Sequence, residues 1–126
     1  MAVGDFNGDG IPDLAGGGWV FLGNGNFTFG AGISLTLIGG IFGEPAVGDF
    51  NGDGKLDVAM VGGFNSPGVS IFTGDGNGAF NAPVAFLAEN SPWFVAVGDF
   101  NGDGKPDLAV ANQTSGNVTV LTNLTP

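Results

Sequence analysis

The sequence of 126 residues contains no cysteine and no histidine. Their absence excludes disulfide bonds, thiol or imidazole catalysis, and zinc sites built from nitrogen and sulfur ligands. Basic residues are almost as scarce, because Lys55 and Lys105 are the only two. A chain so poor in positive charge offers no attractive surface to nucleic acid or to an anionic membrane, so we expect neither as a partner. No apolar run approaches the roughly 20 residues of a membrane-spanning helix.

Acidic residues are more common, and they are unevenly distributed. The formal net charge is −10, and 12 residues are Asp or Glu. Nine of these lie in three short stretches, and only Glu44, Asp75 and Glu89 lie elsewhere. The negative charge therefore belongs mainly to three local sites.

The three stretches are copies of one motif, Ala-Val-Gly-Asp-Phe-Asn-Gly-Asp-Gly-x-x-Asp, at residues 2–13, 46–57 and 96–107. Ten of its twelve positions are identical in all copies, and only the two positions after the last glycine differ. The copies start 44 and then 50 residues apart. This spacing is typical of propeller blades and longer than that of the shorter solenoid repeats.

Each motif has the spacing of a cation-binding loop. With the first Asp as position 1, side-chain oxygens fall at positions 1, 3, 5 and 9, and a backbone carbonyl is available at position 7. Ca²⁺ takes about six to eight oxygen ligands in irregular geometry, so we predict three Ca²⁺ per chain. An EF-hand is excluded because Gly16, Met60 and Val110 stand where it needs a bidentate glutamate. A tight Asp-Asn-Gly turn without metal is the alternative. The predicted ligands are Asp5, Asn7, Asp9, Ile11, Asp13, Asp49, Asn51, Asp53, Lys55, Asp57, Asp99, Asn101, Asp103, Lys105 and Asp107.

Short apolar runs rich in β-branched residues flank each motif, and no helical period fits them. Together with glycine-rich turns at residues 23–26 and 74–78, they predict an all-β fold of antiparallel strands. We expect three or four strands in the first repeat, with its outer strand near residues 33–38. The second repeat is expected to have four strands, and the third to lack the fourth.

Residues 5–14, Asp-Phe-Asn-Gly-Asp-Gly-Ile-Pro-Asp-Leu, and their two counterparts resemble the FG-GAP/VCBS repeat family. Members of this family form β-propeller blades, including those in the head of integrin α chains. The resemblance implies blades at about 2–44, 45–92 and 93–126, with calcium in the Asp-rich loops. One departure is Asn at position 3 of every copy, which lowers the charge of each site. The resemblance also implies an extracellular or cell-surface parent. Since Met1 leads directly into a repeat strand without a signal peptide, we expect a fragment or an engineered piece of such a protein.

The antiparallel topology sorts the loops onto two ends of the blades. The metal loops and the turn at residues 74–78 share one end, and loops that vary in length and sequence occupy the other. This division favours a scaffold that presents binding loops to a protein or glycan. A lectin that uses the variable end is the alternative, with Trp93 as its sugar platform, whereas Trp19 is expected in the core. No catalytic constellation is present, so we expect no enzyme.

Three blades are too few for a closed propeller, which has about four to eight. We therefore expect identical chains to assemble head to tail, with a six-bladed ring of two chains favoured over a larger ring. Within each blade, Phe6, Phe50 and Phe100 are predicted to be buried, one per repeat.

Overall fold

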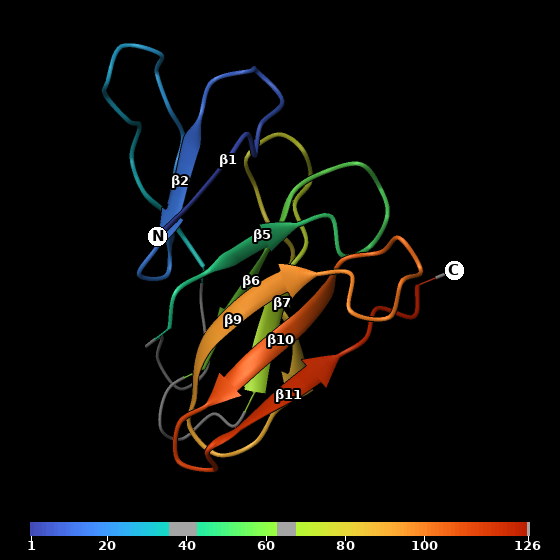
Figure 1. Ribbon diagram of the computed structural model, residues 1–126. Helices are drawn as coiled ribbons and strands as arrows, with labels where there is room; N and C mark the ends of the chain where they lie inside the picture. Colours follow the sequence, from blue (N-terminus) through green and yellow to red (C-terminus); the bar gives the residue numbers. More distant parts are fainter. Residues whose placement is uncertain (36–42, 63–67, 126) are drawn as a thin grey trace.

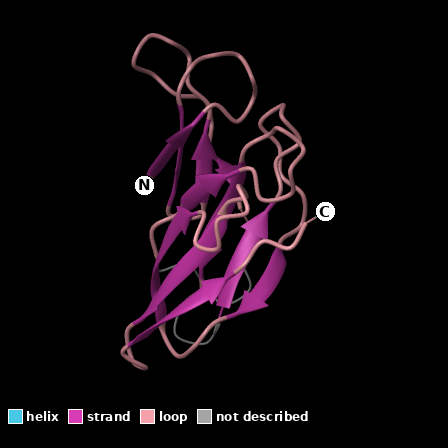
Figure 2. Ribbon diagram, turned by 45° about the vertical axis from the view of Figure 1, so that its right-hand side comes forward, coloured by secondary structure: helices cyan, strands magenta, loops and turns pink. Residues whose placement is uncertain are grey.

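The computed structural model describes residues 1–35, 43–62 and 68–125, and these residues form three antiparallel sheets without a helix (Figure 2). The first sheet contains β1 (Ala2–Gly4), β2 (Asp13–Gly16), β3 (Trp19–Phe21) and β4 (Ile33–Ser34). The middle sheet contains β5 (Ala46–Gly48), β6 (Asp57–Val61), β7 (Gly68–Phe72) and β8 (Val84–Leu87). The third sheet contains β9 (Pro92–Gly98), β10 (Asp107–Asn112) and β11 (Asn117–Leu121).

Each sheet is a meander in which consecutive strands pair in chain order. The repeated motif sets the same register three times, because Ala2, Ala46 and Ala96 lie opposite Ala15, Ala59 and Ala109 in their sheets. No sheet closes into a barrel within the described residues, as expected of separate propeller blades. The all-β prediction, with three to four antiparallel strands per blade, is therefore confirmed.

A two-residue turn connects β2 to β3. Gly17 and Gly18 form it with φ of 58° and 84°, a region that favours glycine. Two consecutive positive φ values match the type I′ turn, whose twist suits paired antiparallel strands. The glycines therefore place Trp19 directly opposite Gly16 and fix the register of this hairpin.

The middle sheet lies between the other two, as Figure 1 shows. β5 contacts β1 on one side and β9 on the other. One core, which includes Phe6 and Phe72, lies between the first and middle sheets, and a second, which includes Phe50 and Val110, lies between the middle and third sheets. Every residue of β6 is buried because this strand is covered on both faces.

Two burial predictions are wrong, for one physical reason. Phe6 and Phe50 are 2% and 6% exposed, but Phe100 is 52% exposed. Trp19, predicted in the core, is 45% exposed. Phe6 and Phe50 each pack against the sheet that follows in the chain. Phe100 and Trp19 lie on the outer faces of the end sheets, where no sheet of the described part covers them.

The outer strand of the first sheet is shorter than predicted over its described residues. It covers only Ile33 and Ser34, and residues 36–38 of the prediction lie outside the described part of the chain. In residues 1–35, 43–62 and 68–125 there is no helix long and apolar enough to span a membrane.

The contrast between the three phenylalanines gives a test with an internal control. Phe50→Ala should lower the free energy of unfolding by about 3–5 kcal/mol, because it removes a buried ring and leaves a cavity between two sheets. Phe100→Ala, in the same motif but on an open face, should cost only roughly 1 kcal/mol. Urea denaturation of dilute protein, where contacts between copies contribute little, measures both changes. Equal losses for the two variants would contradict this account of the core.

Candidate metal centre

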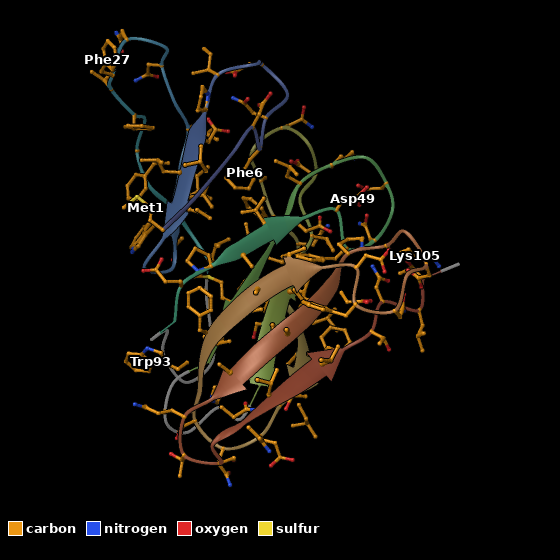
Figure 3. The ribbon with its side chains drawn as sticks, viewed as in Figure 1. Met1, Phe6, Phe27, Asp49, Trp93 and Lys105 are labelled. Atoms are coloured by element: carbon orange, nitrogen blue, oxygen red, sulfur yellow. The ribbon has the colours of Figure 1, made fainter. Side chains whose placement is uncertain are left out.

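Three acidic loops, residues 5–13, 49–57 and 99–107, join the first strand of each sheet to the second. Figure 1 shows them together at one end of the molecule, above and to the right of the sheets. Asp49 and Lys105, labelled in Figure 3, lie in the middle and third loops at this end. The loops also share their backbone shape, since the two glycines at motif positions 4 and 6 have positive φ in every copy.

The first Asp of each loop is the centre of its hydrogen bonds. Asp5 accepts bonds from the N–H groups of Gly8 at 2.8 Å and Asp9 at 3.2 Å through Oδ1, and from that of Gly10 at 2.8 Å through Oδ2. Asp49 and Asp99 accept the same three bonds at 2.6–3.1 Å. The loop thus wraps around a carboxylate before any ion is considered.

These N–H groups favour the charged form of the carboxylate. The Gly10 N–H has the largest effect in holding the pKa of the Asp5 carboxyl below its ordinary value, and the Gly8 and Asp9 N–H groups add to it. In the third loop, the Gly104 N–H does the same to the pKa of Asp99. Both carboxylates therefore stay ionised, which a cation site requires.

The side chains at positions 3 and 5 lie beside one another on the exposed side of the loop. Asn7 Oδ1 accepts a bond from the Asp9 N–H at 3.1 Å, and Asn7 Nδ2 donates to Asp9 Oδ2 at 2.9 Å. Asp9 Oδ1 in turn accepts a bond from the Ile11 N–H at 2.8 Å. The second and third loops repeat this pattern. The structure therefore brings the side chains of positions 1, 3 and 5 into one connected group.

The Asp at position 9 is placed differently, because it is completely buried in all three copies. Asp57 Oδ2 accepts a bond from the Phe50 N–H at 2.9 Å, and Asp57 Oδ1 accepts one from the Gly74 N–H at 2.9 Å. The equivalent residues, Asp13 and Asp107, make the same pair of bonds. This carboxylate ties the start of the acidic loop to the end of the third strand.

The buried position raises the energy of the charged carboxylate. Burial raises the pKa of the Asp57 carboxyl above its ordinary value, and the N–H groups of Gly74 and Phe50 oppose the shift. The negative charges of Asp53 and Asp49 raise it further. A cation bound in this loop would favour the charged form of Asp57 and offset the repulsion from Asp53 and Asp49.

The donor set fits a hard cation, although the carboxylates are not drawn into a tight cluster. No three acidic side chains among the described residues lie close enough together to form a ready metal site. The donors are nevertheless all oxygens, and an ionised carboxylate has about four acceptor positions, of which Asp5 uses three and Asp13 two. Asp9 is exposed and Asn7 is half-buried, and cation binding would require their oxygens to turn toward Asp5. The set suits Ca²⁺ better than Mg²⁺, which demands a strict octahedron.

Sequence reasoning assigned position 9 a single role as ligand and missed its role in the fold. It also missed Gly23, Gly74 and Asn123, whose N–H groups donate to that carboxylate. Strand alternation does not signal this burial, because Asp107 is completely buried although it is in phase with Ala109 and Ala111, which are not.

Repeated meanders of three or four strands, each with an acidic loop after its first strand, define a class of protein, the propeller-type repeat. The FG-GAP-like repeat family model matches residues 5–60 and 49–110, which together span most of the sequence. The chain therefore belongs to the FG-GAP-like repeat family. No match was found among curated proteins, and none among solved structures.

The position 9 carboxylate should be important without any metal. Asp57→Ala leaves the buried N–H groups of Phe50 and Gly74 without acceptors, which should cost about 1–3 kcal/mol for each group. Asp53→Ala removes an equal charge from the exposed part of the loop and should change the stability of metal-free protein by only roughly 0.5 kcal/mol. Urea denaturation in EDTA compares the two variants. The interpretation is wrong if Asp57→Ala unfolds at the same urea concentration as Asp53→Ala.

Proposed function

We propose that this protein is a calcium-stabilised, propeller-type repeat module that acts as a scaffold for recognition and has no catalytic activity. The observation that carries the proposal is the threefold copy of one acidic loop, with the same hydrogen bonds around its first Asp in every sheet. Three equivalent loops at one end of a rigid set of sheets suit a structural role for the ion. A catalytic centre would need only one.

Electrostatics supports the ion. The three loops hold nine of the 12 acidic residues, and the chain has only two basic residues to offset them. Three bound Ca²⁺ would change the formal net charge from −10 to −4, since each ion adds two positive charges. Positions 1, 3, 5 and 9 would contribute side-chain oxygens, and the backbone carbonyls of Ile11, Lys55 and Lys105 would complete the sets. Calcium would supply a local positive charge to each loop, and the carboxylates and their N–H partners would orient the loop around it.

The opposite end of the sheets is suited to recognition. A cavity of about 640 Å³ opens there between the β2–β3 turn, the segment before β5 and the start of β9. Glu44, Trp93 and Phe94 are among the residues that line it. An exposed indole beside a carboxylate is a surface on which a sugar ring can stack and donate a hydrogen bond. This cavity is the observation that favours a carbohydrate-binding lectin as the second candidate function, with an extracellular location to match.

We also propose that copies of the chain associate into a ring. The outer faces of the first and third sheets expose large apolar side chains, including Val3, Trp19, Phe100 and Val118. Patches of this kind mark interaction surfaces on soluble proteins. Two copies with three blades each would give six blades, within the usual range of about four to eight.

Calcium binding is tested by metal content and by stability. Elemental analysis of protein equilibrated with Ca²⁺ should find three ions per chain, and Asp53→Ala should leave two. Each site should stabilise the folded state by about 2.7 kcal/mol when Ca²⁺ is a hundredfold above its dissociation constant, so EDTA should lower Tm strongly. A Tm that EDTA leaves unchanged, together with no bound metal, would refute the proposal.

The lectin is tested with a glycan array. If the cavity binds sugars, the parent should bind one class of glycan, and Trp93→Ala should lose that binding because it removes the exposed ring. Phe86→Ala, which truncates an exposed aromatic of β8 that does not line this cavity, is the matched control and should bind as the parent does. If no glycan on the array binds, the lectin function is excluded and the scaffold function is the one that stands.

A further inference from the structure

Phe27 combines two features that a bulky apolar residue rarely has. Its side chain is fully exposed, and its φ is 64°, in the left-handed region. Figure 3 shows the ring at the tip of the loop between β3 and β4, pointing away from the rest of the molecule. Such a conformation is unfavourable for a phenylalanine and persists mostly where function requires it.

The middle sheet shows what this position does when a neighbouring sheet is present. The β3–β4 loop of the first sheet closes through a bridge between Gly23 and Phe29, and the β7–β8 loop of the middle sheet closes through one between Gly74 and Phe80. Counting from these bridges, Phe27 is the equivalent of Gly78, which also has a positive φ of 87°. Phe29 is the equivalent of Phe80.

Both equivalents contact the preceding sheet. The Gly78 N–H donates to the carbonyl oxygen of Phe6 at 3.0 Å. The Phe80 ring meets the Phe6 ring edge to face, with centroids 5.7 Å apart. The β7–β8 loop thus contacts Phe6 twice, through the backbone of Gly78 and through the ring of Phe80.

The second interface within the chain uses the same anchor. Asn123, which follows β11, donates from Nδ2 to the carbonyl oxygen of Phe50 at 2.9 Å. In both interfaces, the carbonyl oxygen of the motif phenylalanine therefore accepts a hydrogen bond from a segment that follows the third strand of the next sheet. Phe100 has the same position in the third sheet, and its ring is half exposed.

The outer faces of the first and third sheets correspond to the two faces of the middle sheet that are buried against neighbouring sheets. On the third sheet, Val118 is 63% exposed, whereas its equivalent in the middle sheet, Val69, is buried. On the first sheet, Val3 is 63% exposed, whereas its equivalent Val47 packs in the core against that sheet. Each end sheet presents the face that meets a neighbour elsewhere in the chain.

We infer that the outer face of the third sheet binds the outer face of the first sheet in a second copy of this chain. The Phe27 N–H of one copy donates to the Phe100 carbonyl of the other, and the two rings of Phe29 and Phe100 pack edge to face. The inference rests on the proposed ring and deepens it by assigning the contacts. The interface is heterologous, so two copies in a closed ring form two identical interfaces.

Local packing explains why the first sheet can have Phe27 at the position where the middle sheet has Gly78. A Cβ on Gly78 would come within 2.8 Å of Leu22 Cδ1, so the leucine side chain would have to move to admit a larger residue between the first and middle sheets. The residue that corresponds to Leu22 in the third sheet is Thr122, since Gly23 and Asn123 donate to equivalent carboxylates. The shorter threonine leaves space for a side chain at position 27 in the contact between copies.

The test uses one charged substitution on each face. Val3→Asp and Val118→Asp should each remain folded, because both side chains are exposed, and each should be a monomer by light scattering in millimolar Ca²⁺. The parent should have twice the chain mass of 12.5 kDa. Val84→Asp, an exposed valine in the middle sheet, is the matched control and should associate as the parent does.

Mixing the two variants identifies the geometry. Val3→Asp retains an intact third sheet, and Val118→Asp retains an intact first sheet, so an equimolar mixture should recover dimers through one interface. These dimers should have a higher dissociation constant than the parent dimer, because they have one interface and the parent dimer has two. Phe29→Ala should raise the dissociation constant of the parent dimer roughly tenfold.

Three outcomes would overturn the inference: a parent that is monomeric, a mixture that stays monomeric, or a control that also dissociates. Calcium content separates these outcomes from a failure of the calcium proposal. Three ions on monomeric Val3→Asp would show that the metal sites exist without the interface. A parent dimer that contains no metal after equilibration with Ca²⁺ would support the interface and refute calcium binding.

Discussion

One buried carboxylate in each repeat holds the local structure together. Asp57 accepts the N–H of Phe50, at the start of the acidic loop, and the N–H of Gly74, just after the third strand. Strand pairing brings these two segments, which are far apart in the sequence, to the same end of the sheet, and the carboxylate links them there. An acceptor with two separate oxygens satisfies both donors, whereas an asparagine has only one oxygen and could satisfy only one of them. The repeated motif therefore preserves an aspartate at this position for the fold, whether or not it also binds a cation.

The strands could be predicted because their signals are local. The apolar runs, the glycine turns and the repeat itself predicted three or four antiparallel strands per repeat, with the fourth missing from the third, and the three sheets have four, four and three strands. Burial could not be predicted in the same way. Phe6, Phe50 and Phe100 have the same neighbours in sequence, yet only the first two are buried. Whether a blade residue is covered depends on the next sheet in space, and a motif carries no information about that. Trp19 illustrates the same limit on the first sheet.

The candidate site divides along a similar line. The donor spacing predicted a loop around a cation, and in the structure the loop closes around the carboxylate of its first Asp in all three copies. The sequence did not distinguish a carboxylate that turns toward an ion from one that accepts backbone N–H groups, because the residue type is the same for both. The partners of the buried carboxylate were equally hidden. Two are glycines, for which an added Cβ would meet a carbonyl oxygen at 2.3 Å, and the third is Asn123.

The acidic loop and the interface between sheets meet at a single residue. The N–H of Phe6 donates to the buried Asp13, its carbonyl accepts the Gly78 N–H of the next sheet, and its ring fills the core between them. An ion held by the loop would therefore order the residue on which the neighbouring sheet rests. The same ion would also lower the energy of the buried carboxylate, which burial and nearby negative charge raise in Asp57. Since binding is reciprocal, a neighbouring sheet that fixes the phenylalanine would strengthen the loop's hold on the ion by the same free energy. The acidic loop and the interface between sheets are thus coupled through the motif phenylalanine. In the third sheet this residue, Phe100, is half exposed, and no sheet of the described residues packs against it.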